Sequence, residues 1–532
     1  MSFSARLTAQ TGGSVVGRVL NAATNSPIPH ALVTLRGADA GPVQTYVTQT
    51  GSDGRFSISD IVPGNYVPIA SKSGFDQGHS QRMPTPSDTP PIAIQTGQAL
   101  PIDIRLTPQA SITGRIIDGD GDPVRRANVQ AQQYFYVGGK KDLRTTANAA
   151  TDDRGQYRLY NLTAGKYWLL VAPNNRFLAM GLPMHGSGQG QPQANAEPLS
   201  GLAATYYPGS PDFGHATELV VTPGAALENI DMRLAPERLY AIRGSLPQGE
   251  ARQGLSIYAT SLDPNTERGG FQTRFYEDHF ELIGLPPGKY MVNEQQVSTP
   301  QRKITEQRYA RQVVEIVDRD VEHVDLTLSP GATIHGVIKA SDESLLKNNL
   351  NVSFQETDAG RANGYGARVA AGAFSITILP GTYTVHVNGG QAYLQYILAG
   401  SDRLPDFKID TARLPGNLTL VIANDFGKVE GTVTDDAGKP VYNANVTLIP
   451  DAKTADAQDR FRSAYTLANG EFSMTTVPPG QYRLFAWAGV DPGAPLDPDF
   501  LKPFQERGVA VKVESNSKQS FDLKVILAPH TR

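Results

Sequence analysis

Apolar and polar residues alternate with a period of two along much of this chain. Clear examples are IDIRL at 102–106, VDLTL at 324–328 and FDLKV at 521–525. This alternation predicts β-strands that have one face in a core and the other in water. No helical period extends beyond about ten residues. Residues 301–317 come nearest, but they end in β-forming residues and therefore predict a strand.

Two short motifs recur five times in the same order. The first is an apolar residue, a polar residue, glycine, any residue and an apolar residue; its glycines are Gly17, Gly114, Gly244, Gly336 and Gly431. The second is a Pro-Gly-x-Tyr or Ala-Gly-x-Tyr turn that ends at Tyr66, Tyr167, Tyr290, Tyr383 and Tyr482. Because the spacing between the motifs is nearly constant, we predict five complete units, which we number 1 to 5.

Each residue of the turn motif has a structural role. Proline presets φ, glycine adopts a positive φ, and the tyrosine buries its ring while its hydroxyl finds a backbone acceptor. Hairpin turns such as SDGRF at 52–56, DRGQY at 153–157 and ANGEF at 468–472 precede these tyrosines. Short strands separated by such turns are typical of β-sandwiches.

Together these motifs resemble the carboxypeptidase regulatory-like domain, a transthyretin-like β-sandwich. Unit 1 matches the family pattern best, units 2 and 5 match it well, and units 3 and 4 are recognisable mainly by register. The resemblance implies an all-β protein, a tandem array of five immunoglobulin-like or transthyretin-like β-sandwich domains. The predicted units are residues 1–107, 108–236 with a loop insertion near 184–200, 237–329 and 330–424 (both degenerate), and 425–532.

Composition removes several classes of function. The net charge of −4 provides no polybasic field for nucleic acid or anionic lipid. The absence of cysteine removes disulfides, thiolate nucleophiles and cysteine metal sites. No apolar run approaches the roughly 20 residues of a membrane-spanning helix, so we expect no transmembrane segment.

The first residues bear on location. MSFSARLTAQTGG has no apolar core of a signal peptide, yet it resembles the tail of a cleaved signal followed at once by a strand. We therefore expect a true start further upstream and a periplasmic, extracellular or cell-surface protein. A cytoplasmic location follows if Met1 is the true start.

Candidate catalytic groups are sparse. His215 and Glu218 have the His-x-x-Glu spacing of metallocarboxypeptidases, and His323 or His335 could supply a third ligand. The chain shows no helical signal for the large α/β catalytic domain of those enzymes, so we expect no catalytic residue, no metal and no cofactor. Acidic turns such as 118–122 leave Ca²⁺ as an alternative, although aspartate in such turns more often caps its own backbone.

Clustered aromatic residues are the best clue to binding. Tyr134, Tyr136, Tyr206 and Tyr207 are the candidates for stacking on sugar rings, followed by residues 275–280 and by Tyr393 with Tyr396. The alternative interpretation is that these side chains fill cores and the seams between domains.

The sequence therefore predicts a non-enzymatic, exported or cell-surface protein that acts as a structural spacer, an adhesion protein or a binding scaffold. Its expected partners are a polysaccharide or a cell-envelope protein. One alternative is an array of carbohydrate-binding modules that serves polysaccharide use, and another is an accessory part of a metallocarboxypeptidase. Short connections at 107–111 and 329–333 favour a stiff, extended rod about 150–200 Å long.

Overall fold

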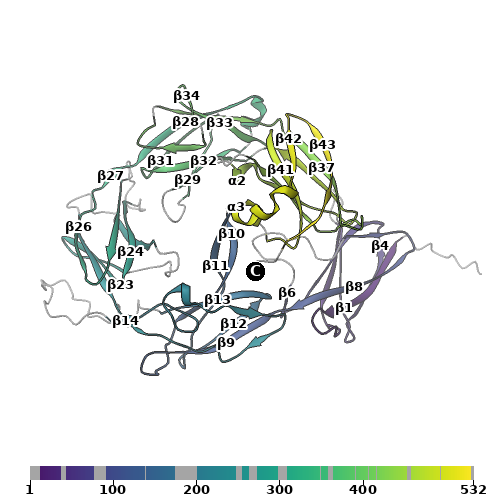
Figure 1. Cartoon of the computed structure of the whole chain (residues 1–532), viewed down its shortest axis with the longest axis horizontal. Helices are drawn as coiled ribbons and strands as arrows, with labels where there is room; N and C mark the ends of the chain where they lie inside the picture. Colours follow the sequence, from purple (N-terminus) through teal and green to yellow (C-terminus); the bar gives the residue numbers. More distant parts are fainter. Residues whose placement is uncertain are drawn as a thin grey trace, which may run out of the picture.

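The computed structural model describes most of the chain as β-strands (Figure 1). It describes residues 12–37, 44–76, 91–137, 139–173, 200–246, 255–262, 272–296, 308–347, 349–357, 364–389, 391–404, 406–414, 416–451, 457–491 and 493–528. Of the loop insertion predicted near 184–200, residues 184–199 lie outside these ranges, and so do the first eleven residues of the chain. None of the helices in the described ranges has the length and apolar character needed to cross a membrane.

Unit 1 has one sheet of order β4-β1-β8-β6 and a second of order β3-β2-β5-β7. The strands are β1 Gly13–Asn21, β2 Leu32–Gly37, β3 Thr45–Gln49, β4 Arg55–Ile61, β5 Gly64–Ser71, β6 Phe75–Asp76, β7 Ile92–Ile94 and β8 Ala99–Pro108.

Unit 2 has one sheet of order β12-β9-β17, with β18 also on β9, and a second of order β11-β10-β13-β15, with β16 also on β13. The elements are β9 Ala110–Ile117, β10 Asn128–Val137, β11 Lys140–Ala150, β12 Gln156–Leu162, β13 Gly165–Ala172, β15 Thr205–Tyr206, η1 Phe213–His215, β16 Leu219–Val221, β17 Ala226–Leu227 and β18 Met232–Arg233. A separate pair, β14 Ser200–Leu202 with β19 Pro236–Arg238, leads into unit 3.

Units 3 and 4 repeat the two-sheet plan. Unit 3 contains β20 Tyr240–Ser245, β21 Leu255–Ser261, β22 Gln272–Phe275, β23 His279–Leu285, β24 Gly288–Gln296, β25 Arg308–Ile316, β26 Val321–Val324 and β27 Ser329–Pro330. Unit 4 contains β28 Ala332–Ala340, η3 Glu343–Lys347, β29 Asn351–Glu356, β30 Gly364–Arg368, β31 Ala373–Ile378, β32 Thr382–Asn388, β33 Tyr393–Ala399, β34 Asp402–Arg403, β35 Lys408–Asp410 and β36 Leu418–Ala423. The predicted strand within 301–317 is confirmed as β25.

Unit 5 has sheets of order β40-β37-β43 and β39-β38-β41-β42, with β44 also on β41. Its elements are β37 Gly427–Thr434, β38 Asn445–Pro450, α2 Ala457–Arg460, β39 Arg462–Tyr465, β40 Glu471–Val477, β41 Gly480–Ala488, η4 Ala494–Leu496, α3 Pro498–Leu501, η5 Lys502–Arg507, β42 Val509–Val513, β43 Lys518–Lys524 and β44 Ile526–Leu527. The all-β sandwich class is confirmed, while the exact bounds between units stay predictions.

Each pair of sheets encloses a core of its own. In unit 1, Val15 and Val19 of one sheet pack with Val33 and Leu35 of the other. Corresponding clusters lie between the two sheets of every other unit. The first strand of each unit pairs in parallel with a strand near the end of that unit, namely β8, β18, β26, β36 and β43. The chain therefore enters and leaves each sandwich at opposite ends, which joins the units head to tail.

The glycine of the first motif lies directly opposite an aromatic residue on the next strand of its sheet. The pairs are Gly17–Phe56, Gly114–Tyr157, Gly244–Phe280, Gly336–Phe374 and Gly431–Phe472. At Gly336, an added Cβ would lie 2.2 Å from the Phe374 ring. Glycine is required here because the aromatic ring crosses the strand where a side chain would otherwise stand.

The tyrosine of the second motif makes the same contact in every unit, a hydrogen bond back to the preceding turn that we call the tyrosine corner. Its ring is at most 3% exposed, and its hydroxyl donates to the carbonyl oxygen four residues earlier. The oxygen–oxygen distances are 2.7 Å for Tyr66, 2.9 Å for Tyr167, 2.7 Å for Tyr290, 2.7 Å for Tyr383 and 2.7 Å for Tyr482. The predicted backbone acceptor is thus confirmed, and it fixes the turn that precedes each strand. The predicted positive φ of the motif's glycine is wrong for Gly64, Gly381 and Gly480, which do not have one, whereas Gly165 and Gly288 have φ of +155° and +153°.

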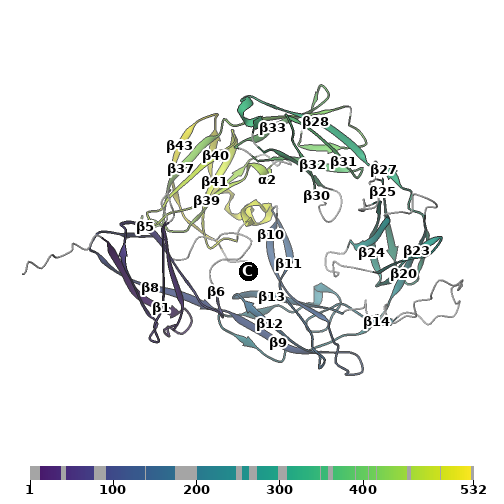
Figure 2. The same cartoon turned by 180° about the vertical axis from the view of Figure 1, so that it is seen from behind.

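The prediction of an extended rod is wrong. Figure 1 and the reverse view in Figure 2 show the sandwiches curving around a ring. The hairpin of β10 and β11 reaches across the ring to the helical segment of unit 5. The ring of Tyr136 lies 6.1 Å from that of Phe500, centroid to centroid. This contact joins units 2 and 5, which are distant in sequence, so the chain curves back on itself.

One core position is occupied by a carboxyl group. Alternation along β24 directs Tyr290, Val292 and Glu294 to the same side, and Glu294 is 1% exposed. Within the described ranges neither of its carboxyl oxygens has a hydrogen-bond partner. Burial disfavours the ionised form and raises the pKa of Glu294 to about 7.

We predict that removing the hydroxyl of Tyr482 destabilises unit 5. In Tyr482→Phe the carbonyl of Pro478 loses its donor, which should reduce the free energy of unfolding by about 1–2 kcal/mol. Trp487 of the same strand, observed in a Trp168→Phe background, reports urea unfolding of this unit. The matched variant Tyr167→Phe should leave the unfolding transition of unit 5 unchanged, because it removes the equivalent hydrogen bond in unit 2. An unaltered midpoint in Tyr482→Phe would contradict the prediction.

We also predict that unit 3 loses stability as the pH rises. The pKa of Glu294 in the folded state lies above the ordinary glutamate value of 4.5, so folding favours the protonated carboxyl. Stability is therefore full below about pH 4.5 and falls as the pH rises through about 7. Glu294→Gln should abolish this dependence and stabilise unit 3 by about 2–3 kcal/mol at about pH 8.

Urea unfolding with pulse-labelling hydrogen exchange of β24 peptides measures this effect. Glu315→Gln is the control, because the side chain of Glu315 on β25 is 58% exposed. Equal pH dependence in the wild-type chain and in Glu294→Gln would disprove the assignment.

Candidate functional site

Four aromatic side chains gather on the outer face of one unit 2 sheet. We call Tyr134 of β10, Trp168 of β13, Tyr206 of β15 and Phe213 of η1 the aromatic cluster. Ring centroids are separated by 4.9 Å for Tyr134–Trp168, 6.2 Å for Trp168–Phe213 and 5.2 Å for Tyr206–Phe213. Most of these contacts are edge-to-face, an arrangement favoured by the ring quadrupoles.

Strand alternation places these residues outside the core. On β13, Tyr167 and Leu169 belong to the unit 2 core, so Trp168 between them faces outward. Tyr134, Trp168 and Phe213 are half-buried, whereas Tyr206 is 1% exposed and forms the base of the cluster. Burial raises the pKa of Tyr134, which keeps its hydroxyl protonated.

Two polar side chains border the aromatic cluster. The Lys141 ammonium lies 4.3 Å from the centroid of the Tyr134 ring, a cation–π contact. Gln132 pairs with Trp168 across the two strands and is 8% exposed. In the described part of the chain, its amide oxygen has no hydrogen-bond partner. An aromatic surface with polar groups at its border is suited to bind a ligand with both apolar and hydroxylated faces.

The structure brings together only part of the predicted tyrosine set. Tyr134 and Tyr206 share the aromatic cluster. Tyr136 lies further along β10 and contacts Phe500 of unit 5. Tyr207 is half-buried against the unit 2 core. Sugar stacking by any of the four tyrosines stays a prediction.

Sequence reasoning missed Trp168 and Phe213. A signal for Trp168 was present, because it directly follows the buried tyrosine of the AGKY motif and must point to the opposite face. At the same place the other units carry Val67, Met291, Thr384 and Arg483. Phe213 had no such signal, since it reaches the sheet through an irregular segment.

The His-x-x-Glu pair is not assembled into a common site. The Nδ1 atom of His215 lies 3.2 Å from an Asp212 carboxyl oxygen, and Glu218 pairs with Lys166 at 3.1 Å. His323 and His335 belong to units 3 and 4. The described residues contain no group of three or more potential metal-ligating side chains.

The acidic turn of unit 2 is occupied by its own backbone. The Asp118 carboxylate accepts hydrogen bonds from the backbone N–H groups of Asp120 and Asp122 at 3.0 and 2.9 Å. This is the self-capping geometry expected of aspartate in turns.

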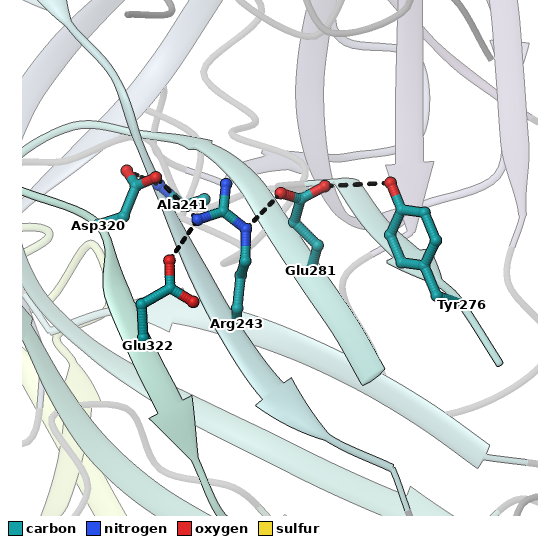
Figure 3. A network of polar contacts seen from close by, with 6 residues as sticks. All are labelled: Ala241, Arg243, Tyr276, Glu281, Asp320 and Glu322. Carbon is teal, nitrogen blue, oxygen red and sulfur yellow. Dashed lines mark hydrogen bonds and ion pairs between the residues drawn. The ribbon is translucent and has the colours of Figure 1, made fainter. Parts of the chain in front are cut away.

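The aromatic residues at 275–280 lie beside a network of charges (Figure 3). The Tyr276 ring stacks on His279 with centroids 4.4 Å apart, and its hydroxyl donates to Glu281 at 3.3 Å. Arg243 donates to Glu281 at 2.7 Å and to Asp320 at 2.9 Å, and it also donates to Glu322. Burial works to lower the pKa of Arg243, but these hydrogen bonds outweigh it and raise the pKa. The network joins the strands of one sheet.

The remaining aromatic pair is also engaged within the chain. Tyr393 donates its hydroxyl to Asp425 at 2.8 Å, and Arg403 lies 4.4 Å from the centroid of the Tyr396 ring. Tyr393 therefore contributes to the contact between units 4 and 5. This matches the alternative interpretation, in which the aromatic residues fill the seams between domains.

Comparison with family models matches the carboxypeptidase regulatory-like domain at residues 14–107, 111–175 and 428–524. These segments fall within units 1, 2 and 5, as the motifs predicted. No curated protein matches the chain.

Solved structures with some similarity include the Bacillus anthracis TIE protein, at 13% identity, covering 60% of this chain and 51% of that chain with a TM-score of 0.18. A streptococcal ancillary pilin has 12% identity and covers 54% of this chain and 99% of that chain, with a TM-score of 0.19. A minor pilin of Streptococcus agalactiae has 12% identity. The match covers 45% of this chain and 98% of the pilin chain, with a TM-score of 0.22. At such TM-scores the similarity carries no argument about function.

Proposed function

Because units 1, 2 and 5 are carboxypeptidase regulatory-like domains, we propose that this chain is a non-enzymatic scaffold of the cell envelope or cell surface. Its role is to hold five sandwiches in a fixed, curved arrangement and to present a binding surface on unit 2. The observation that carries this proposal is the contact of the β10–β11 hairpin with unit 5, which ties together units distant in sequence.

Contacts between successive units support a fixed arrangement. Arg311 of unit 3 donates to Glu356 of unit 4, whose side chain is only 3% exposed. Between units 4 and 5, the Nδ1 atom of His386 lies 2.6 Å from a carboxyl oxygen of Asp459. In the buried Arg311–Glu356 pair, desolvation offsets much of the electrostatic attraction, so the pair contributes to the geometry of the contact more than to stability.

The hairpin contact is closely packed. Gly139 has φ +75°, and a Cβ at this position would lie 2.5 Å from the carbonyl oxygen of Leu496 in η4. Across the same contact, Gly493 has φ +83° and an added Cβ would lie 3.0 Å from the Tyr136 carbonyl oxygen. Glycine on both sides permits this close approach of backbones.

We predict that Gly139→Ala opens the ring. The new methyl group collides with Leu496, in addition to the cost of about 1–2 kcal/mol for a left-handed backbone. Small-angle X-ray scattering should show a larger radius of gyration and maximum dimension. Gly121→Ala is the matched control, because Gly121 has φ +93° but no heavy atom within 4 Å of an added Cβ. If the wild-type chain scatters as a series of units that move independently of one another, the scaffold proposal would be overturned.

A second candidate function is carbohydrate binding, favoured by the half-buried rings of Tyr134 and Trp168. The apolar C–H face of a sugar can pack on such rings while its hydroxyls remain hydrated. This agrees with the alternative function that the sequence suggested.

We predict that the purified chain is retained on an insoluble polysaccharide and that a soluble oligomer competes with it. Tyr134→Ala and Trp168→Ala should each weaken retention roughly ten-fold, through loss of about 1–1.5 kcal/mol of aromatic contact. Tyr160→Ala is the control, since Tyr160 belongs to the same unit, lies outside the aromatic cluster and is 62% exposed. Retention on isolated cell envelopes alone would point to a protein partner instead.

A further inference from the structure

We propose that the aromatic cluster of unit 2 recognises an acidic saccharide, a uronic acid residue whose carboxylate pairs with Lys141. This inference rests on the carbohydrate-binding function proposed above and specifies its ligand class.

The first argument is the state of the Lys141 ammonium. It lies over the Tyr134 ring, and its strand position is opposite Tyr136 on β10. Among the described residues it forms no ion pair. Two other cations of unit 2 have an acidic partner, Arg144 with Asp142 at 3.0 Å and Lys166 with Glu218 at 3.1 Å. Lys141 is therefore an unmatched positive charge at the border of the aromatic cluster.

The second argument is the amide of Gln132. Its strand partner is Trp168, and its Nε2 donates to the Gln130 oxygen at 3.4 Å, while its own oxygen accepts nothing in the described ranges. An unsatisfied buried acceptor costs about 1–3 kcal/mol. The oxygen is buried in the free protein, so a ligand hydroxyl reaches it after a rotamer change of Gln132 and then recovers this cost. An acceptor and a cation thus border the same aromatic surface.

Together these groups match the chemistry of one sugar ring. A pyranose presents an apolar C–H face to Trp168 and a hydroxyl to Gln132. A carboxylate at C6 extends from the edge of the ring and can reach the Lys141 ammonium, where the charge-assisted hydrogen bond is about twice as strong as a neutral one. A neutral sugar would leave the positive charge unmatched, so the cluster should discriminate between the two.

Calorimetric titration of the full chain tests this inference. The probes are oligogalacturonate, oligomannuronate and a neutral cello-oligosaccharide of equal length. We expect one of the acidic oligomers to bind about ten-fold more tightly than the neutral one at about 50 mM salt. The preference should shrink at about 0.5 M salt, because screening weakens the ion pair.

Variants separate this inference from the proposals on which it rests. Lys141→Gln should abolish the preference and retain neutral binding, whereas Trp168→Ala should weaken both. Lys140→Gln is the matched control, because it removes the same charge one residue away on the opposite face of β11. Equal binding of acidic and neutral oligomers, or equal effects of the two lysine variants, would overturn the acidic ligand while leaving carbohydrate binding intact. Binding of no oligomer would overturn both, and the scattering test of the scaffold would remain unaffected.

Discussion

The hydrogen bond from a buried tyrosine hydroxyl to a backbone carbonyl four residues earlier is the interaction on which every unit depends. Each unit has a small core, and a small core alone leaves limited stability to hold a turn in one conformation. The corner closes the turn, anchors a large ring between the sheets and satisfies a polar group inside the protein. Together with the glycine that leaves room for an aromatic ring from the neighbouring strand of the same sheet, it recurs in every unit, including units 3 and 4.

In each unit the first strand pairs in parallel with a strand near the end of the unit, and this has a consequence beyond the single unit. Head-to-tail joining alone is compatible with a rod or with a curve. The curvature is set by the side chains at the seams, such as Arg311 with Glu356, and by the length of the β10–β11 hairpin. That hairpin extends well beyond the sheet to which it belongs and meets unit 5 through Tyr136 and Gly139. One enlarged hairpin therefore converts a series of neighbours into a closed arrangement.

The outer face of one sheet is covered in unit 5 but partly exposed in unit 2. This face carries the two tryptophans of the chain, Trp168 in unit 2 and Trp487 in unit 5. In unit 5, the segment from η4 to η5 covers this face, Trp487 is fully buried and its indole N–H donates to Thr447 at 2.8 Å. In unit 2, Trp168 is half-buried and borders a lysine and an unsatisfied amide. A covering segment makes the first face part of the structure, and the second retains the partial exposure that a ligand requires.

The sequence by itself determined the class of fold, because strand alternation and turn chemistry are local properties. The period of two, the Pro-Gly-x-Tyr turns and the recurring glycines were sufficient to predict β-sandwich units and the burial of tyrosines such as Tyr482. The tertiary structure decided what surrounds the outward-facing residues. Tyr134 and Tyr206 lie together and Tyr136 does not, because the first two face one sheet surface of unit 2 while the third reaches unit 5. Such contacts join residues that are tens to hundreds of positions apart, and no local pattern records them. For the same physical reason the ring, rather than a rod, could be recognised only from the three-dimensional arrangement.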